Sequence, residues 1–217
     1  MAIDRHINFF ELQKASALPG CPLCRIISDR AERYIDNLLF EHVSDRGFRK
    51  AHRDAGGFCA FHSRRLTSFR DGLAVAILGR DILEDRIEHF RKRKPWRPSK
   101  PCPICAEKDR IEHEYLGFLS GCGGKDGDEE ELKNVFTASD GLCAPHYGDF
   151  LASFKKIPSW LVEFHEKKFT GLKKRTDQFI EFSAYGRQDE FAKLSEKDQL
   201  VWKELASVLR GNDGPQD

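Results

Sequence analysis

Cys21-Pro22-Leu23-Cys24, followed by Cys59-Ala60-Phe61-His62, is the pattern that decides the fold of this chain, and the chain carries it twice. The second copy is Cys102-Pro103-Ile104-Cys105 followed by Cys143-Ala144-Pro145-His146. The two halves of a copy are separated by 34 residues in the first copy and by 37 in the second. Each copy therefore supplies three thiols and one imidazole, which is the donor set of a tetrahedral structural zinc site.

The spacing within each half allows both donors to reach one ion. A Cys-x-x-Cys turn brings two sulfurs together, and a cysteine and a histidine three positions apart share one face of a helix's first turn. Backbone N–H groups at a helix N-terminus also favour the thiolate form of cysteine. The predicted metal ligands are Cys21, Cys24, Cys59, His62, Cys102, Cys105, Cys143 and His146.

Zinc is the predicted metal, at two ions per chain, because a Cys₃His shell saturates one zinc ion. An iron–sulfur cluster or a thiol redox role is the alternative, although clusters more usually take four thiolates. A saturated shell leaves no position for a reactive water, so we expect a structural role for the metal. The near-equal spacings favour ligand pairing within each copy, while pairing across the copies stays open. Reduced, partly buried cysteines beside capping histidines would require the same coincidence twice.

The composition is typical of a helical protein. Of the 217 residues, 40% are hydrophobic and 33% are charged, and phenylalanine, leucine and alanine carry much of the apolar content. The net charge of +1 gives no overall attraction to nucleic acid or to an anionic membrane. Apolar runs long enough to span a membrane and a secretory signal are both missing from the sequence, so we expect a cytoplasmic protein. In such a compartment paired cysteines more often bind metal than form disulfides.

Hydrophobic periodicity predicts one all-α domain over residues 1–217, made of two helical hairpins. A pseudo-twofold axis is expected to relate the hairpins, each stapled by one Cys₃His zinc site. In the first hairpin, one long helix is expected to begin near Cys59 and to run to Phe90. The predicted segments are repeat 1 at about 19–90, a basic proline-rich linker at 91–101, repeat 2 at 102–186, and a C-terminal helix and tail at 187–217.

This frame of residues resembles an uncharacterised prokaryotic family, known as a domain of unknown function. Its members carry Cys-Pro-x-Cys, a helix with Tyr, Leu, Glu, Val and Asp, then Gly-Phe-Cys-x-x-His, and a second set of both Cys motifs. The matching positions here are Cys21, Cys24, Tyr34, Leu38, Glu41, Val43, Asp45, Cys59, His62, Cys102, Cys105, Cys143 and His146. The resemblance implies a soluble prokaryotic protein and names no activity.

The predicted function is a zinc-stabilised helical scaffold or interaction module whose partner is a protein, not nucleic acid or a membrane. The sequence leaves open whether a small molecule binds, and a non-catalytic role is favoured over an enzyme. The enzymatic alternative is an acidic site between the repeats, because Glu41 and Asp45 share a helical face. The favoured interpretation of that pair is helix-end carboxylates that bind Arg49 or backbone donors. Cys122, which lies outside both copies, is expected to be a free thiol.

Overall fold

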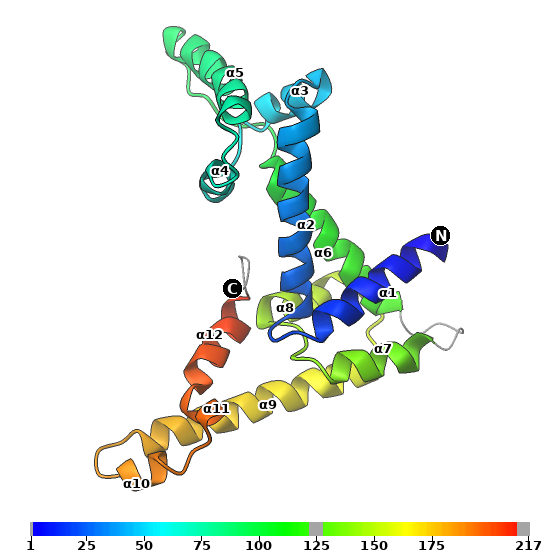
Figure 1. Ribbon diagram of the computed structural model, residues 1–217, viewed down its shortest axis with the longest axis vertical. Coiled ribbons are helices and arrows are strands. Elements are labelled where there is room, and N and C mark those ends of the chain that lie inside the picture. Colours follow the sequence, from blue (N-terminus) through cyan, green and yellow to red (C-terminus); the bar gives the residue numbers. More distant parts are fainter. Residues whose placement is uncertain (1, 122–127, 212–217) are drawn as a thin grey trace. The chain divides into compact units, whose positions relative to one another are not determined.

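A computed structural model describes residues 2–121 and 128–211, and every regular element in these ranges is a helix (Figure 1). The predicted all-α fold is confirmed. The elements are α1 (Ala2–Ser16), α2 (Pro22–Asn37), the π-helix η1 (Leu38–His42), α3 (Arg46–Asp54), α4 (Ala60–Thr67), α5 (Gly72–Arg91), α6 (Pro103–Gly121), α7 (Asp128–Thr137), α8 (Ala144–Ser153), α9 (Ser159–Phe182), α10 (Gln188–Phe191), α11 (Glu196–Gln199) and α12 (Val201–Arg210). Among these helices, none has both the length and the apolar character needed to cross a membrane.

The chain divides into two compact units, which do not coincide with the two copies of the motif. Unit 1 comprises Met1–Ser28 and Glu112–Asp217, and unit 2 comprises Asp29–Ile111. Each unit therefore takes half of its cysteine motifs from each copy, and α2 and α6 contribute residues to both units. The single-domain organisation and the pseudo-twofold relation between repeats stay predictions.

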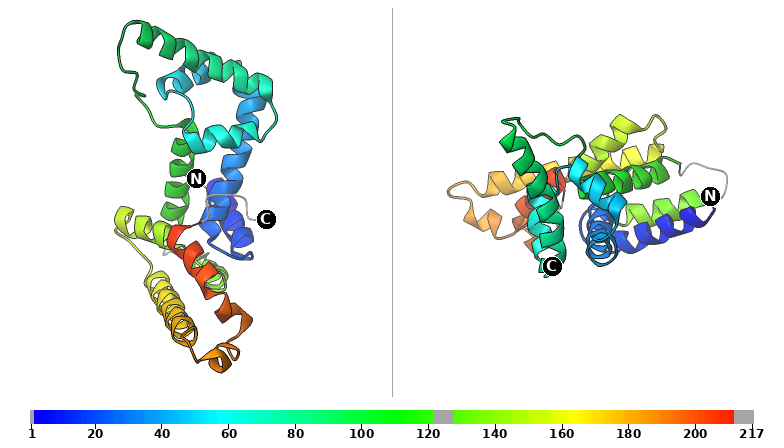
Figure 2. Two further views of the ribbon diagram at one scale, coloured as in Figure 1. Left: turned by 90° about the vertical axis from the view of Figure 1, so that its left-hand side faces the viewer. Right: turned by 90° about the horizontal axis from the view of Figure 1, so that it is seen from above.

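The core of unit 2 lies between α2, η1, α4 and α5. Its buried side chains recur at helical spacing along α2 and η1, as the periodicity predicts. They are Ala31, Ile35, Leu38, Leu39, Val43, Leu66, Ala74, Leu78, Cys102 and Ile104. Helix α5 also packs beside α3, which Figure 2 shows from two further sides. Two ion pairs fix this packing, Arg49 with the buried Asp81 at 2.6 Å and Arg53 with Asp85.

The prediction of one long helix from Cys59 to Phe90 is wrong, because the chain forms α4 and α5 with a break between them. At the break, Arg70 has a φ of 59°. Asp71 then caps α5, since its side chain accepts a hydrogen bond from the N–H of Ala74 at 2.9 Å. A side-chain oxygen that satisfies a free N–H starts a new helix in this way. Gly72 just after the cap lowers the tendency to continue the previous helix.

The core of unit 1 is aromatic and lies where α6, α7, α8 and α9 meet. Tyr115, Phe136 and Phe150 are fully buried there. Helix α1 packs against α7, and α9, the longest helix at 24 residues, contacts α7, α10, α11 and α12 (Figures 1 and 2). Helix α12 packs against α8 as well. The C-terminal helix is thereby fixed to the helix that carries two of the predicted ligands.

Candidate metal centres

All four half-motifs lie at helix starts, as the spacing predicts. Cys59 and Cys143 are the N-cap residues of α4 and α8, with φ and ψ of −65° and 166° for one and −70° and 167° for the other. Cys21 and Cys102 each precede a proline that begins a helix, α2 and α6. Gly57 and Gly141, two residues before their cysteines, have φ of 91° and 64° and turn the chain into the ligand.

The ligands pair across the copies, so the prediction of pairing within each copy is wrong. The structure groups Cys21, Cys24, Cys143 and His146, here called the unit 1 cluster, and Cys59, His62, Cys102 and Cys105, the unit 2 cluster. The physical reason lies in the helices that follow the first half-motif. The run of α2 and η1 carries its two ends about 30 Å apart, and the nine residues of α3 are too few to bring the chain back. Spacing along the sequence therefore does not measure closeness in space.

In the unit 1 cluster one imidazole nitrogen contacts all three sulfurs. The Nδ1 atom of His146 lies 3.5 Å from the Sγ of Cys21, 3.5 Å from that of Cys24 and 3.2 Å from that of Cys143. The Sγ atoms of Cys24 and Cys143 are 3.7 Å apart. A ring nitrogen has one proton or one lone pair, so it cannot make a well-directed hydrogen bond to all three sulfurs at once. An ion at the centre of the four atoms would account for all three contacts.

The unit 2 cluster repeats this arrangement with different residues. The Nδ1 atom of His62 lies 3.3 Å from the Sγ of Cys59, 3.5 Å from that of Cys102 and 3.4 Å from that of Cys105. The sulfurs of Cys59 and Cys105 are 3.8 Å apart. This separation is far beyond the roughly 2.05 Å of a disulfide bond. The same nitrogen, Nδ1, is used in both clusters.

These distances fit a tetrahedral zinc ion. Ligands at about 2.3 Å for sulfur and about 2.05 Å for nitrogen give edges of about 3.8 Å between two sulfurs and about 3.6 Å between sulfur and nitrogen. The sulfur–sulfur distances of 3.7 and 3.8 Å match the first edge, and the sulfur–nitrogen distances fall up to about 0.4 Å below the second. In each cluster all four donor atoms lie within 4.8 Å of one another. Both clusters can therefore hold one metal ion, and their donor set suits zinc.

Without a metal, the unit 1 cluster favours a thiolate beside an imidazolium. Burial raises the pKa of Cys21, but hydrogen bonds from Cys143, Cys24 and His146 outweigh it and bring that pKa well below its usual value. Burial lowers the pKa of His146, but hydrogen bonds to Cys143 and Cys21 and the negative charge of both raise it to about 10. The cluster is thus a place where positive charge is stabilised. A divalent ion that displaces the imidazole proton would be stabilised by the same negative charge of the thiolates.

The unit 2 cluster divides its charge differently. Burial and the neighbouring Cys102 raise the pKa of Cys105 to about 12. Cys59 has a pKa below its usual value even though burial opposes this, because backbone N–H groups of His62 and Phe61 and the thiols of Cys105 and Cys102 hydrogen-bond to it. These N–H groups belong to the first turn of α4, as expected for a thiolate at a helix N-terminus.

His165, in α9, is a supporting residue that no sequence motif identifies. It is fully buried, and its Nε2 accepts a hydrogen bond from the N–H of Leu142 at 2.9 Å. Because a backbone N–H can only donate, Nδ1 carries the proton and donates to the carbonyl of Leu161 at 2.8 Å. Burial lowers the pKa of His165 to about 4, which keeps the ring in this neutral form. His165 thereby fixes the turn that presents Cys143.

Two further contacts of the unit 1 cluster come from residues distant in sequence. The Oε1 atom of Glu112 lies 3.7 Å from the Nε2 of His146, the ring nitrogen that faces away from the sulfurs. A carboxylate in this position orients a ligand histidine. At Gly211, which ends α12, a Cβ atom would lie 3.2 Å from the sulfurs of both Cys24 and Cys143. The backbone of the C-terminal turn therefore lies directly against the cluster.

Glu41 and Asp45 are not among the metal-ligand groups found in the described part of the chain. Glu41 is exposed, and Asp45 caps α3 by accepting a hydrogen bond from the N–H of Phe48 at 2.6 Å. The helix-end interpretation of Asp45 is therefore confirmed. Cys122 lies outside the described residues. Trp96 in the 91–101 linker packs against Gly56, where a Cβ atom would overlap its ring, and Ser99 donates two hydrogen bonds to the carbonyl of Asp54 at 2.9 Å.

Comparisons with known proteins identify one uncharacterised relative and one family of unknown function. An uncharacterised 23.9 kDa protein in the xynA 3′ region of Caldicellulosiruptor sp. (strain Rt8B.4) is 31% identical over 136 residues, which is 60% of this chain and 65% of that protein. The match thus covers slightly less than two thirds of the relative's length. No solved structure matches the chain. Residues 7–100 are similar to a family of unknown function, DUF6062, which confirms the predicted resemblance to an uncharacterised domain family.

Proposed function

We propose that each cluster holds one structural zinc ion, and that the protein is a zinc-stabilised helical scaffold rather than a metalloenzyme. The observation that supports this most directly is the single Nδ1 atom in each cluster that lies within 3.5 Å of three sulfurs. Four protein donors complete a tetrahedral shell and leave no position for water or substrate. The ion would supply stability by tying helix starts together. Structural zinc contributes about 10–16 kcal/mol apparent in zinc-finger peptides at neutral pH.

The size of each cluster argues for a single ion over an iron–sulfur cluster. Four donor atoms within 4.8 Å of one another leave no room for bridging sulfides and a second iron. We expect anaerobically purified protein to be colourless and to carry two equivalents of zinc by elemental analysis. Brown protein that contains iron and acid-labile sulfide would overturn the zinc assignment. Protein with less than one equivalent of any metal after zinc supply would overturn the metal role itself.

Two double variants test the pairing of the ligands. Cys21→Ser with Cys143→Ser removes two ligands from the unit 1 cluster and leaves the unit 2 cluster complete, so one zinc ion per chain should remain. Cys21→Ser with Cys59→Ser removes one ligand from each cluster, so both ions should be weakened and lost to a mild chelator. Each variant removes two thiols, which makes the pair a matched comparison. If ligands paired within copies, the two results would be exchanged.

A protein partner is the second part of the proposal. Its support is the exposure of large apolar side chains in unit 2, where Phe40 is 88% and Leu73 is 74% exposed. Aromatic side chains such as that of Phe40 are enriched in the cores of protein interfaces. A photo-crosslinking amino acid at position 40 should capture one defined protein in cells that express the chain, and the same group at the exposed Lys50 should not. Equal capture from both positions would count against a binding surface at Phe40.

A further inference from the structure

Unit 2 contains a cavity that neither cluster uses. Its volume is about 420 Å³, and it lies where the Gly56–Phe58 turn faces α4 and α5. The wall is mainly aliphatic, with Leu66, Val75, Leu78, Ile82 and Leu83 among the lining residues. None of the lining residues in the described part of the chain carries a carboxylate. Small-molecule sites typically have this size, an apolar wall and a few polar groups.

One of the polar groups is the imidazole of His52. This residue lines the cavity and is only 2% exposed, and its ring lies against those of Phe48 and Phe58. Its Nδ1 atom is buried and has no hydrogen-bond partner within the described ranges. Burial lowers the pKa of His52, so the ring is neutral and offers one donor and one acceptor. Because Nδ1 has no accessible surface, the nitrogen that can meet a ligand is Nε2, which lies 3.8 Å from the position of a Cβ at Gly57 in the cavity wall.

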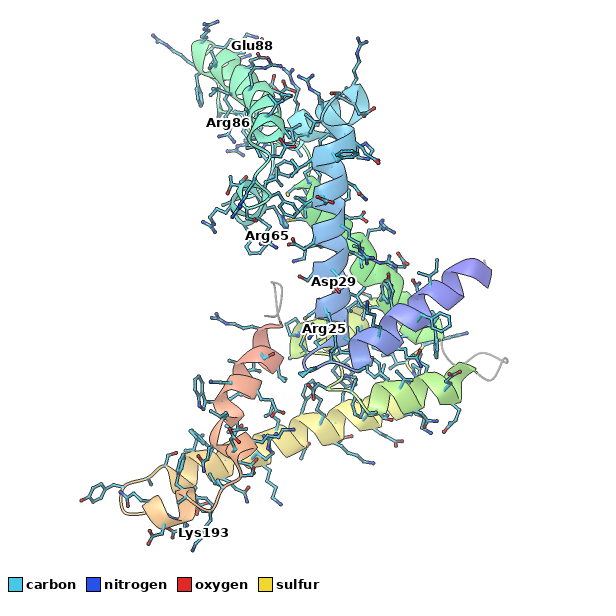
Figure 3. The ribbon with its side chains drawn as sticks, in the orientation of Figure 1. Arg25, Asp29, Arg65, Arg86, Glu88 and Lys193 are labelled. Carbon is cyan, nitrogen blue, oxygen red and sulfur yellow. The ribbon has the colours of Figure 1, made fainter. Side chains whose placement is uncertain are left out.

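The second polar group is the guanidinium of Arg86, which Figure 3 labels on α5. The arginines around it are paired: Arg49 with Asp81, Arg53 with Asp85, and Arg80 with Glu84. Arg86 instead lies over the ring of Trp96, at 4.8 Å from its centroid, and has no ion pair among the described residues. The positive charge at the exposed side of the cavity is therefore available to an anion.

Gly79 is an exposed residue of the cavity lining. It lines the cavity from the interior of α5, and a Cβ atom added there would meet nothing within 4 Å. Glycine in a helix interior is less stable than alanine. A larger side chain at this position would stay in the helix and project where the wall is now open.

We propose that this cavity binds a small amphipathic carboxylate, with its apolar body against the aliphatic wall. Arg86 attracts the carboxylate, and His52 donates a hydrogen bond to the ligand. A carboxylate suits the site because a guanidinium forms charge-assisted hydrogen bonds with it. Binding here does not depend on which metal the clusters hold, so it stands apart from the proposed scaffold function.

The test uses the full chain with its metal, titrated with decanoate, 1-naphthaleneacetate and decanol by calorimetry and tryptophan fluorescence. We expect saturable binding of at least one acid at one site per chain. Binding of decanoate would show that the cavity accepts an aliphatic body, and binding of 1-naphthaleneacetate would show that it accepts an aromatic one. Decanol should bind about tenfold more weakly than decanoate if the aliphatic acid is the ligand. Absence of saturable binding by both acids up to about 1 mM, the weak end of specific affinities, would overturn the proposal.

Two variants locate the binding. Gly79→Leu should fill the cavity and weaken binding at least about tenfold while the helix content is unchanged. Gly171→Leu is the matched control, because Gly171 is also an exposed glycine in a helix, α9, with open space at its Cβ. Arg86→Gln should weaken the binding of the acid and leave the binding of decanol unchanged. Equal binding by both leucine variants, or an unchanged acid affinity in Arg86→Gln, would overturn the assignment.

Discussion

Gly211→Ala should weaken the metal of the unit 1 cluster and leave that of the unit 2 cluster unchanged. Gly211 has φ of 71° and ψ of −178°, a region that only glycine readily adopts. A residue with a Cβ held there costs about 1–3 kcal/mol. The new Cβ would also lie 3.2 Å from two ligand sulfurs, closer than ordinary contact. If this cost falls on the metal-bound state, zinc affinity drops about 5- to 150-fold.

Competition with a chromogenic zinc chelator measures this effect directly. With one proposed ion in each cluster, the unit 2 cluster serves as an internal reference in the same titration. Gly186→Ala is the control, because Gly186 in the same unit also has positive φ, at 87°, but has open space around its Cβ. This control introduces the backbone strain without any contact to sulfur. Circular dichroism should show both variants folded when zinc is bound.

Two results would refute this reasoning. If Gly211→Ala releases both ions as the unaltered protein does, the C-terminal turn does not restrain the cluster. If Gly186→Ala loosens the same ion equally, backbone strain in unit 1 is the cause and the sulfur contact contributes nothing.

Three further predictions concern the thiols, the buried histidine and the buried ion pair. In metal-free protein, brief iodoacetamide treatment should alkylate Cys59 before Cys21, because Cys59 is half-buried with a lowered pKa and Cys21 is buried; peptide mass spectrometry gives the order. His165 has a folded pKa of about 4, below the roughly 6.5 of an unfolded chain. The unfolded state therefore binds the proton first, and unit 1 should lose about 3 kcal/mol as pH falls from about 6.5 to 4; His165→Asn should lack this part of the loss in denaturant titrations. Asp81→Asn should destabilise unit 2 by about 2–3 kcal/mol, because Arg49 loses its buried anionic partner and one of its two hydrogen bonds, and the new amide NH₂ group faces the guanidinium.

Each of these has a control or a contradicting outcome. Equal alkylation of Cys59 and Cys21 would show that accessibility does not govern thiol reactivity here. An acid dependence unchanged in His165→Asn would mean that other groups carry it. For Asp81, the control is Asp177→Asn, which removes an exposed pair with Lys173 and should change stability by less than about 0.5 kcal/mol. Equal effects of the two aspartate variants would contradict the importance of burial.

The eight candidate ligands, which the structure groups into two clusters, could be selected from the sequence because metal chemistry restricts local spacing. Cys-x-x-Cys and Cys-x-x-His fix two donors each, and Pro22 and Gly141 mark the helix starts and turns around them. Which half-motifs meet is a different question, since it depends on how far each helix carries the chain. The helix break at Asp71 could not be predicted either, because the apolar periodicity continues across it. One capping hydrogen bond, from the N–H of Ala74 to Asp71, starts the new helix there.

The contacts that support the unit 1 cluster could not be predicted from the sequence. His165 and Gly211 are 22 and 68 residues after Cys143, and neither belongs to a motif. A histidine in a helix and a glycine after one are ordinary features with many explanations. Only the fold shows that one fixes the turn before Cys143 and that the other lies against its sulfur.

Ligand pairing across the copies has a consequence for synthesis. The donors of unit 2 all lie within Asp29–Ile111, so that unit can capture its ion while the rest of the chain is still being translated. Cys21 and Cys24 leave the ribosome first, yet their partners Cys143 and His146 follow more than a hundred residues later. At about 5–20 residues per second this interval lasts roughly 6–24 s. During that time two reactive thiols of a nascent polypeptide stand unprotected, and the cell must keep them reduced until the late half-motif arrives.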